Sequence, residues 1–327
     1  MIVAFDARDA HRPPLRGWGR YAAELERALP ALVDLRPIRD GGAGPELLFE
    51  QVRLPRVLRR TRPDVVHSPN CFLPLRRPCP GVVTIHDLAF EAHPGDFEQA
   101  TGAKYRWFTP RAVRSADRVI CVSQFTADDV AERYGVDPAK LRVVPNAPSL
   151  PIGARPVPGG EPYVLAVGDL RPKKNLARLV EAWRAAGTGR RLVLAGLGAA
   201  PWPDVEAPGF VEEAELDALL RGADLLVHPS LYEGFGLVVA EAMARGVPVA
   251  CSATTALGEL GAGAAELFDP LDPDEIGAAM LRALDRREEL TRLGLERVAD
   301  LSWERSARET AAVYAEAVRE GPSGGSG

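Results

Sequence analysis

Short apolar segments alternate with amphipathic segments along the whole chain of 327 residues. The apolar segments are rich in Val, Ile and Leu and run for about five to seven residues, which is typical of strands buried on both faces of a parallel sheet. The segments between them carry apolar residues at helical spacing. Because strands and helices alternate, the pattern predicts βαβ units and parallel sheets.

The pattern runs through the first half of the chain, breaks, and then restarts. In the first half we expect strands at 2–7, 64–68, 81–86, 118–123 and 141–146, and helices at 20–29, 49–60, 104–116 and 125–134. In the second half we expect strands at 162–168, 191–196, 224–230, 248–252 and 265–269, helices near 175–186, 212–222, 236–245 and 273–285, and a last helix at 303–320. Two doubly wound halves predict a cleft between them, and ligands of such sheets bind beyond the carboxyl ends of the strands.

The break between the halves is a proline-rich segment. Its prolines are Pro145, Pro148, Pro151, Pro156, Pro158 and Pro162. Prolines at this density prevent regular structure and give a semi-rigid spacer. We therefore predict a first domain at 1–147, a linker at 148–162, a second domain at 163–302, a separate helix at 303–320 and a flexible tail at 321–327.

Composition and charge exclude several classes of protein. No apolar run approaches the ~18–20 residues that a transmembrane helix needs, and the chain starts as a strand without the features of a signal peptide. The cysteines (Cys71, Cys79, Cys121 and Cys251) lack paired zinc-site spacing, so we expect buried free thiols in a reducing, cytoplasmic compartment. The net charge of −5 divides into +4 over residues 1–150 and −9 over the rest, which is too mild for a nucleic-acid-binding protein.

The segment HPSLYEGFGLVVAEAMARGVPVA (228–250) is rich in candidate chemistry. After a strand, a loop with Gly234 and Gly236 leads into a helix. Glycines let the backbone approach a ligand closely, and the N-terminus of a helix offers N–H groups that suit an anion. Carboxylates beside an anion site are suited to sugar hydroxyls, so we expect one of Glu233 and Glu241 on a transferred sugar and the other on a ribose.

The Glu-x7-Glu spacing, with GFGL after Glu233 and EAMARGVPV after Glu241, resembles the donor-site signature of glycosyltransferase family 4. The likeness extends over nearly the whole chain. It implies the GT-B fold, in which two Rossmann-like parallel-sheet domains face a central cleft and the last helix packs back on the first domain. It also implies that Glu233 lies by the donor sugar and that Glu241 holds the ribose. The diphosphate is then expected on the backbone of Gly234, Phe235, Gly236, Leu237 and Val238.

A second constellation lies in VGDLRPKKNLARLVEAW (167–183), where a strand ends at Gly168. Arg171, Lys173 and Lys174 occupy the turn that follows, and cations at the carboxyl end of a strand suit a diphosphate leaving group. The resemblance implies that Lys174 contacts the donor phosphates.

This chain departs from the family at one position of that turn. Many members have an arginine where the chain has Asp169, so we expect Lys173 or Arg171 to supply the second cation. The alternative is a solvated turn capped by Asn175.

A third candidate is His86 in VVTIHDLAF (82–90), which ends an apolar strand. The resemblance implies that His86 reaches the donor sugar, and that Asp87 forms hydrogen bonds nearby on the acceptor side. The residues expected to be catalytic are therefore His86, Lys174 and Glu233.

Weaker signals lie elsewhere in the chain. We expect Gly17 and Gly19 in a loop after the first strand, although Ala22 breaks the full dinucleotide-binding fingerprint. The resemblance places this loop over the donor phosphates and the acceptor, with Arg20 on the acceptor side. It also implies that backbone groups of Phe210 and Val211 meet the nucleobase.

Two further patterns have ordinary alternatives. The Asp272-Pro273-Asp274 run has the spelling of a metal motif but opens a predicted helix, where acidic residues serve as caps, so we expect neither a metal nor a cofactor. The basic segment 52–62 is either a surface helix or an amphipathic contact with an anionic membrane.

Together these patterns predict a retaining glycosyltransferase that moves a mannosyl or glucosyl type of hexose from a GDP- or UDP-linked sugar. The predicted acceptor is a sugar, a glycolipid or a small molecule. Another GT-B enzyme (an epimerase or a phosphorylase) and a non-catalytic sugar-nucleotide-binding subunit remain the alternatives. We expect no nucleic-acid partner, a cytoplasmic location, and room for peripheral membrane contact through the basic first domain.

Overall fold

The computed structural model describes residues 1–12, 15, 17–153, 161–196, 198 and 200–321. The chain forms two compact units. Unit 1 comprises Met1–Asn146 together with Leu301–Gly327, and unit 2 comprises Ala147–Asp300. Part of the predicted linker (154–160) and most of the predicted tail (322–327) lie outside the described residues.

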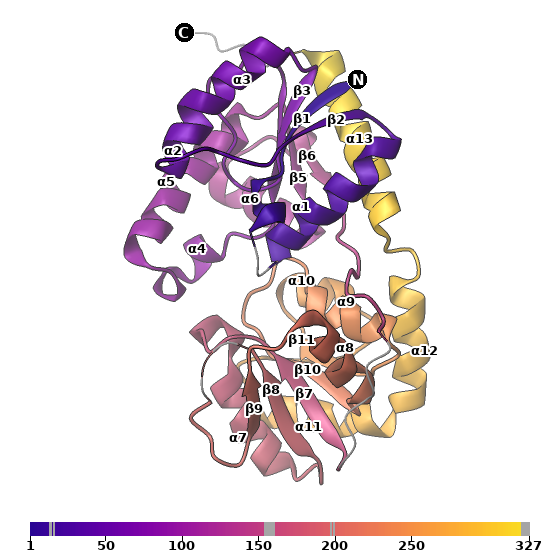
Figure 1. Cartoon of the computed structure of the whole chain (residues 1–327). Helices are drawn as coiled ribbons and strands as arrows, with labels where there is room; N and C mark the ends of the chain where they lie inside the picture. The colour runs from indigo at the N-terminus through magenta and orange to yellow at the C-terminus, as the bar shows by residue number, and fades with distance from the viewer. Residues whose placement is uncertain (13–14, 16, 154–160, 197, 199, 322–327) are drawn as a thin grey trace. The chain divides into compact units, whose positions relative to one another are not determined.

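Unit 1 is built on a parallel sheet of six strands in the order β2-β1-β3-β4-β5-β6 (Figure 1). The strands are β1 (Ile2–Asp6), β2 (Asp34–Ile38), β3 (Val65–Ser68), β4 (Gly81–Ile85), β5 (Arg118–Cys121) and β6 (Leu141–Val143). The helices are α1 (Gly17–Ala28), α2 (Glu46–Leu48), α3 (Leu54–Thr61), α4 (Ala89–Ala92), α5 (Gln99–Ser115), α6 (Gln124–Tyr134) and α13 (Trp303–Glu320). The strand order reverses between β1 and β3, which makes the carboxyl ends of these two strands the switch point of the sheet.

Alternate residues of β3 and β4 face two different helical layers, as the period of a strand requires. Val66 and Val83 belong to the core cluster that also contains residues of α3, α5 and α6. On the other face, His67 and Thr84 meet α1 and α13. Both faces of the sheet are therefore covered.

Helix α13 spans the predicted range 303–320 and packs on unit 1, although it follows unit 2 in sequence (Figure 1). Its Tyr314 hydroxyl lies 2.6 Å from His67 Nδ1, and His67 Nε2 lies 2.8 Å from Thr84 Oγ1. Burial lowers the pKa of His67 from 6.5 to about 3. The imidazole is therefore neutral, and it ties α13 to β3 and β4.

Unit 2 has a second parallel sheet, in the order β12-β11-β10-β7-β8-β9. The strands are β7 (Tyr163–Val167), β8 (Arg191–Ala195), β9 (Glu206–Gly209), β10 (Leu225–His228), β11 (Val249–Ser252) and β12 (Glu266–Phe268). The helices are α7 (Leu176–Ala186), α8 (Glu213–Gly222), α9 (Leu237–Ala244), α10 (Thr255–Gly261), α11 (Pro273–Asp285) and α12 (Arg287–Val298). The order reverses between β7 and β10, so the switch point of unit 2 lies at their carboxyl ends.

Two doubly wound parallel-sheet halves confirm the predicted fold class. The sequence pattern missed the edge strands β2 (DLRPI) and β9 (EAPG). Edge strands tolerate proline and charged residues because one side of their backbone is not paired within the sheet. The predicted helix 49–60 is a π-helical turn at Phe49–Arg53 followed by α3, where Pro55 lies in the first turn and needs no intrahelical N–H bond.

The described part of the chain shows two further features of the sequence analysis. The cysteines Cys71, Cys79, Cys121 and Cys251 are free and buried, as expected. In the described ranges, none of the helices combines the length and the apolar character needed to cross a membrane.

Candidate active site

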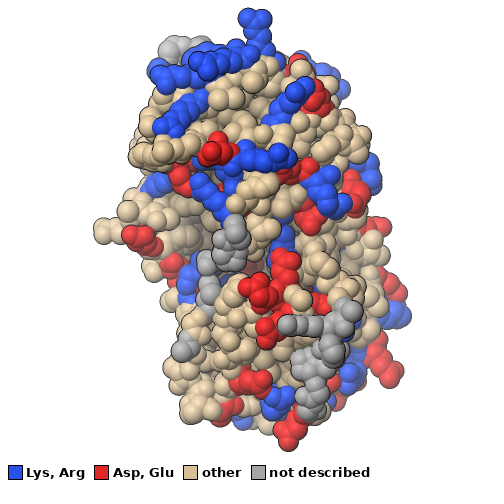
Figure 2. Space-filling model, viewed as in Figure 1, with Lys and Arg blue, Asp and Glu red and all other residues tan. Residues whose placement is uncertain are grey.

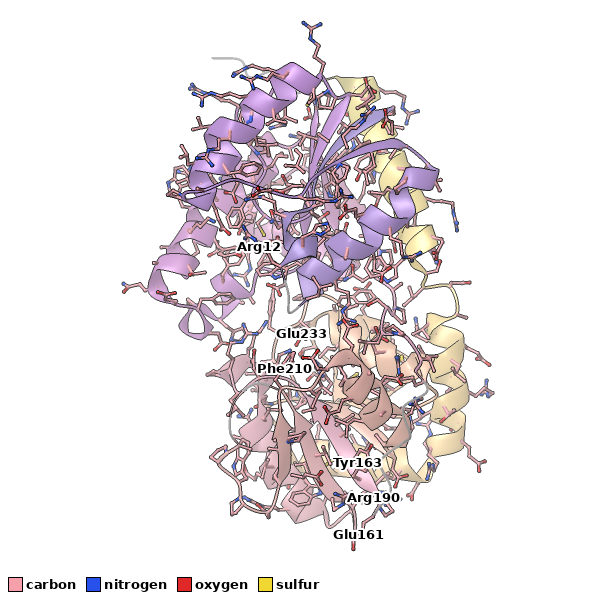
Figure 3. The ribbon with its side chains drawn as sticks, in the orientation of Figure 1. Arg12, Glu161, Tyr163, Arg190, Phe210 and Glu233 are labelled. Carbon is pink, nitrogen blue, oxygen red and sulfur yellow. The ribbon has the colours of Figure 1, made fainter. Side chains whose placement is uncertain are left out.

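The switch point of unit 2 is formed by the loop after β7 (168–175) and the loop after β10 (229–236). Figure 3 shows Glu233 and Phe210 at this end of the sheet, whereas Glu161, Tyr163 and Arg190 lie toward the other end. The two loops are joined by a hydrogen bond of 2.8 Å from Leu231 N to Lys173 O. Parallel sheets bind their ligands at such a point.

Glu233 and Lys174 form the ion pair at the centre of this site. Lys174 Nζ lies 2.5 Å from Glu233 Oε1, and each side chain is 16% exposed. Burial alone would raise the pKa of Glu233, but Lys174, His228 and Lys173 together hold that pKa well below its usual value. Glu233 is therefore ionised.

His228 supports the same carboxylate. Its Nε2 lies 3.3 Å from Glu233 Oε1 and 3.3 Å from Ser230 Oγ. Burial lowers the pKa of His228, and Glu233 only partly offsets that effect, so the ring is neutral at pH 7. Within the described residues its buried Nδ1 has no hydrogen-bond partner. Sequence analysis missed His228, although its position at the end of a predicted strand was a usable signal.

The basic turn is packed rather than solvated. Asn175 adopts a left-handed conformation (φ +57°), and its side-chain amide donates to Pro229 O and Pro270 O at 3.1 and 2.6 Å. Lys173 is buried, and its charge lowers the pKa values of both His228 and Glu233. Asn175 stands at the N-cap of α7, as the alternative had it, but Asn175 and Lys173 are buried, so this part of the turn is not solvated.

Asp169 forms an ion pair with Arg171, one of the two residues expected to supply a second cation beside Lys174. Its carboxylate accepts hydrogen bonds from Arg171 Nε at 2.9 Å and pairs with Arg171 Nη2 at 2.8 Å. The charge of Arg171 is therefore balanced within the turn. Lys173 is left as the candidate partner of Lys174.

The glycine loop has a conformation that other residues adopt poorly. Gly236 has φ +94°, and a Cβ at this position would lie 2.7 Å from Leu257 Cδ2. Helix α9 starts at the next residue, so its first N–H groups have no intrahelical acceptor. Gly196 is the crowded position beside the loop after β7, because a Cβ there would come within 1.7 Å of Gly168 O, whereas a Cβ on Gly168 would lie 3.3 Å from Lys174 Cδ.

Glu241 has partners that the sequence did not indicate. Its Oε1 accepts the backbone N–H groups of Ser149 and Leu150 at 2.6 and 2.9 Å, and its Oε2 lies 2.7 Å from Arg245 Nη1. The Glu241 side chain is 5% exposed. The carboxylate therefore holds the segment that enters unit 2, and its expected role on the ribose stays a prediction.

Arg245 extends this buried cluster. It binds Asp217 Oδ1 at 2.8 Å and Leu150 O at 2.8 Å, while Asp217 Oδ2 accepts Gly153 N–H at 3.0 Å. The predicted linker is thus not a spacer over residues 149–153, because its backbone is bound by Glu241, Asp217 and Arg245.

Phe210 and Val211 follow β9 at the carboxyl end of the sheet. Gly209 has φ +78°, and the Phe210 ring is 49% exposed. The expected contact of the backbone groups of Phe210 and Val211 with a nucleobase stays a prediction.

His86 and Asp87 follow β4 in unit 1. His86 Nε2 donates to Pro69 O at 2.8 Å, and the Tyr21 ring packs against the imidazole at 4.7 Å. Burial lowers the pKa of His86, so the ring is neutral and its Nδ1 is left as an acceptor. Asp87 Oδ1 accepts Ala89 N–H at 2.9 Å near the start of α4.

The prediction that Gly17 and Gly19 lie in a loop was wrong. Helix α1 begins at Gly17 and includes Arg20. A Cβ on Gly19 would lie 2.8 Å from Asp9 O, so the glycine lets the first turn of α1 pack closely on the 3-10 turn Arg8–His11.

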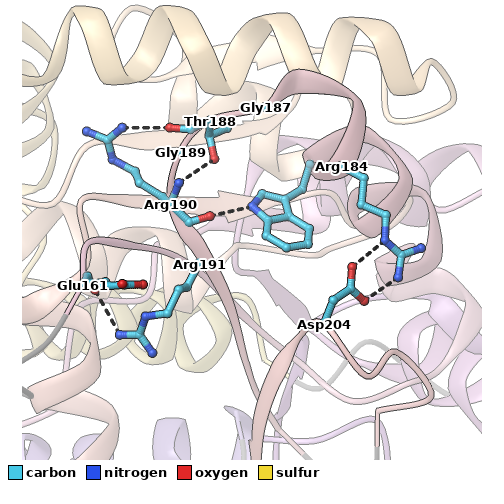
Figure 4. Close-up of a pocket in the computed structure, with 9 residues that line it drawn as sticks. Glu161, Arg184, Gly187, Thr188, Gly189, Arg190, Arg191 and Asp204 are labelled. Carbon is cyan, nitrogen blue, oxygen red and sulfur yellow. Dashed lines mark hydrogen bonds and ion pairs between the residues drawn. The ribbon is translucent and has the colours of Figure 1, made fainter.

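A separate pocket lies at the opposite end of the unit 2 sheet from the Lys174–Glu233 pair (Figure 4). Its arginines are paired: Arg184 with Asp204, Arg190 with Asp224 and Arg191 with Glu206. It lies by the start of β7 and β8 rather than at their carboxyl ends, so we do not assign it to the candidate site.

Comparison with known proteins shows the family of this chain. The model of Glycosyltransferase Family 4 matches residues 11–148, and that of Glycosyl transferases group 1 matches residues 153–296. The MMP alpha-(1->4)-mannosyltransferase of Mycolicibacterium hassiacum is 32% identical over 84% of this chain and 76% of its own length. The chain belongs to glycosyltransferase family 4. The O-antigen chain mannosyltransferase B of Escherichia coli is 29% identical over 96% of this family 4 chain and 99% of its own length.

Solved structures agree on the fold of this family 4 glycosyltransferase. Sucrose-phosphate synthase from Thermosynechococcus elongatus superposes with a TM-score of 0.76 at 23% identity, over 98% of this chain and all of that one. The predicted GT-B fold and the predicted enzyme class are confirmed. The two curated relatives named above are transferases, and they lend no support to an epimerase, a phosphorylase or a non-catalytic subunit.

Proposed function

We propose that this glycosyltransferase moves a mannosyl or glucosyl type of hexose from a GDP- or UDP-linked sugar, with retention of anomeric configuration. The acceptor is a sugar, a lipid-linked sugar or a small molecule. The observation that carries the proposal is the Lys174–Glu233 pair at the switch point of unit 2, with His228 on the same carboxylate. A cation beside a glycine loop suits a diphosphate, and a carboxylate suits sugar hydroxyls.

Donor binding exchanges the partners of these side chains. A diphosphate draws Lys174 away from Glu233, since charge-assisted bonds to phosphate are among the strong ones. Glu233 then becomes an acceptor for hydroxyls of the transferred sugar, and His228 keeps its carboxylate oriented. Lys173 and the N-terminus of α9 add to the positive potential around the phosphates.

In the proposed reaction the bond between the anomeric carbon and the phosphate oxygen breaks, and a bond from that carbon to the acceptor oxygen forms on the same face. The acceptor hydroxyl gives its proton to the departing phosphate oxygen, so neither oxidation nor reduction occurs. Lys174 stabilises the charge that develops on the leaving group. His86 keeps the proposed role of orienting a sugar hydroxyl through Nδ1, without acting as a nucleophile.

The basic surface of unit 1 supports at most an electrostatic contact with anionic lipid headgroups. Figure 2 shows basic side chains gathered over α3, where Arg56, Arg59 and Arg60 are exposed. The apolar side of that helix, Leu54 and Leu58, is buried in the core of unit 1 and leaves no apolar face to insert. Such a contact weakens with salt, so sedimentation with anionic vesicles at low and high salt tests it.

The proposed transfer is tested with purified protein, GDP-mannose and UDP-glucose as donors, and a panel of glycosides as acceptors. Two results together support the proposal. Release of nucleoside diphosphate depends on the acceptor, and the one-bond C1–H1 NMR coupling of the transferred sugar shows the same anomeric configuration in the product as in the donor. A product of opposite configuration would overturn retention. Absence of release with every nucleotide sugar tried would overturn the donor class.

A further inference from the structure

The switch point of unit 1 carries a group of side chains that the donor chemistry does not use. It lies where the loops after β1 and β3 meet, and the two loops are tied by Asn70 Nδ2 donating to Asp9 Oδ2 at 2.7 Å. Ligands of open parallel sheets bind at such points. The rule that locates the donor loops in unit 2 therefore also indicates a ligand in unit 1.

An aromatic platform stands at this point. Trp18, in the first turn of α1, is stacked on Tyr105 of α5 with ring centroids 5.9 Å apart and planes 15° apart. Phe72 and Phe90 back Tyr105 at 4.8 and 5.2 Å. Trp18 is nevertheless 38% exposed. A large ring that is held flat by its neighbours and still meets solvent offers a ready surface for a ligand.

The polar groups around the platform are balanced in charge. Arg12 and Lys104 both pair with Glu46, at 2.7 and 2.9 Å, and Arg12 lies 4.0 Å from Asp9. In this group the two cations are matched by two carboxylates, which does not favour a phosphate or another anion. Carboxylates and an amide beside an aromatic face instead suit a neutral ligand with hydroxyl groups at its rim and C–H groups on its face, which describes a pyranose.

The platform is also close to a candidate catalytic residue of the same unit. Trp18 and Tyr21 are three residues apart on α1 and therefore lie on one face of the helix. Tyr21 packs edge-on against His86 at 4.7 Å. A sugar seated on Trp18 lies about one helical turn from the ring that contacts His86.

We propose that the Trp18–Tyr105 pair seats a pyranose ring of the acceptor, with Asp9 accepting one of its hydroxyl groups. The acceptor of this enzyme is then a carbohydrate rather than an uncharged lipid or a small aromatic molecule. This assignment rests on the proposed function, because it identifies the acceptor of that transfer.

A binding measurement tests the platform without any need for turnover. Methyl α-D-mannopyranoside and methyl α-D-glucopyranoside serve as probes in saturation-transfer NMR, with glycerol as an open-chain polyol. Wild-type protein is expected to transfer saturation to the ring C–H protons of at least one pyranoside and not to glycerol. Trp18→Ala is expected to lose at least about nine-tenths of that signal, and Trp18→Phe to keep part of it.

The matched control is Trp107→Ala, because Trp107 is 49% exposed on the same helix as Tyr105 but is covered by the Arg111 guanidinium at 4.0 Å. This variant should transfer saturation as wild type does. Loss of signal in Trp107→Ala equal to that in Trp18→Ala, an unchanged signal in Trp18→Ala, or no signal from either pyranoside with wild type would each overturn the platform.

The proposed donor site and the proposed platform can be tested independently of each other. Thermal shift with GDP and UDP reports on the donor site and on folding of every variant. A wild-type protein that binds the pyranosides but shows no shift with either nucleotide contradicts the donor proposal and leaves the platform standing. A nucleotide shift without pyranoside binding contradicts the platform alone.

Discussion

Lys174 Nζ and Glu233 Oε1 lie 2.5 Å apart, although their side chains come from loops that follow two different strands of unit 2. The pair joins the basic turn to the glycine loop. It also keeps a carboxylate ionised in a largely buried place, where burial alone would favour its neutral form. The family resemblance implied a role for each residue, and the structure adds that the two side chains pair with each other.

Lys174→Ala should lower kcat by about 10²–10³-fold, the loss typical of removing one group that stabilises charge in the transition state. Lys174→Arg should recover part of the activity, because it keeps the positive charge. Steady-state kinetics with a saturating donor measures both. The control is Arg171→Ala, which removes a cation already balanced by Asp169 and should change kcat far less. Equal losses in the two alanine variants would contradict the assignment.

Glu241→Ala should raise the donor KM strongly if Glu241 holds the ribose, and the structure adds an expected loss of stability. Removing this carboxylate takes away the acceptor of two backbone N–H groups, while Arg245 keeps Asp217 and Leu150 O as partners, and the loss of these buried hydrogen bonds costs about 1–3 kcal/mol. Urea unfolding measures the stability, and donor titration of the folded fraction measures the affinity.

Arg245→Met separates the two effects of Glu241, because it disrupts the buried cluster without removing the Glu241 carboxylate. A variant that loses stability but keeps the donor KM supports independent roles. A donor KM raised as far as in Glu241→Ala would mean that the cluster, rather than a direct contact with the ribose, sets the affinity.

Gly236→Ala should weaken donor binding and cost more stability than Gly187→Ala. Both glycines have positive φ, +94° and +58°, but a Cβ meets Leu257 Cδ2 at 2.7 Å only at position 236, since nothing lies within 4 Å of a Cβ at 187. Backbone strain alone costs roughly 1–2 kcal/mol, and Gly187→Ala should show that amount. Thermal unfolding and nucleotide titration of both variants test the difference, and equal behaviour would contradict a special role for the glycine loop.

Stability of unit 1 should fall as the pH drops below 6.5, because His67 is neutral when folded and takes up a proton when unfolded. Its pKa is lowered by burial from 6.5 to about 3. The stabilisation is therefore complete above pH 6.5 and is lost progressively down to about pH 3, by at most about 1.4 kcal/mol per pH unit. Urea unfolding at a series of pH values gives the free energy of unfolding as a function of pH. This free energy should fall less steeply with decreasing pH for His67→Gln than for wild type. Parallel slopes would show that His67 does not cause the loss.

Much of the fold could be predicted because central strands are continuously apolar and helices keep their period. The ends of these strands then located His86 and Lys174, since a residue that follows a buried parallel strand reaches the carboxyl edge of the sheet. The short edge strands β2 and β9 escaped because proline and charged residues interrupt their apolar pattern. Gly17 and Gly19 suggested a loop, but they are in a helix that needs glycine for close packing on Asp9.

The contacts of the site could not be predicted from the sequence, because its partners are far apart along the chain. Glu241 binds backbone N–H groups 92 and 91 residues away. Trp18 stacks on Tyr105 in a different helix. The hydrophobic period and the sequence motifs indicate which face of a helix or which edge of a sheet a residue occupies. Which residues from distant segments come into contact is visible only in the folded structure.

The central claim is that the unit 2 switch point binds the diphosphate of a nucleotide sugar through Lys174. Isothermal titration of GDP and of UDP into wild type and Lys174→Ala tests it most directly. We expect wild type to bind at least one of the two nucleotides, and Lys174→Ala to bind it at least about tenfold more weakly, since a charge-assisted bond to phosphate contributes about 1.5–3 kcal/mol. Equal affinity in the two proteins, or no binding of either nucleotide by wild type, would contradict the account.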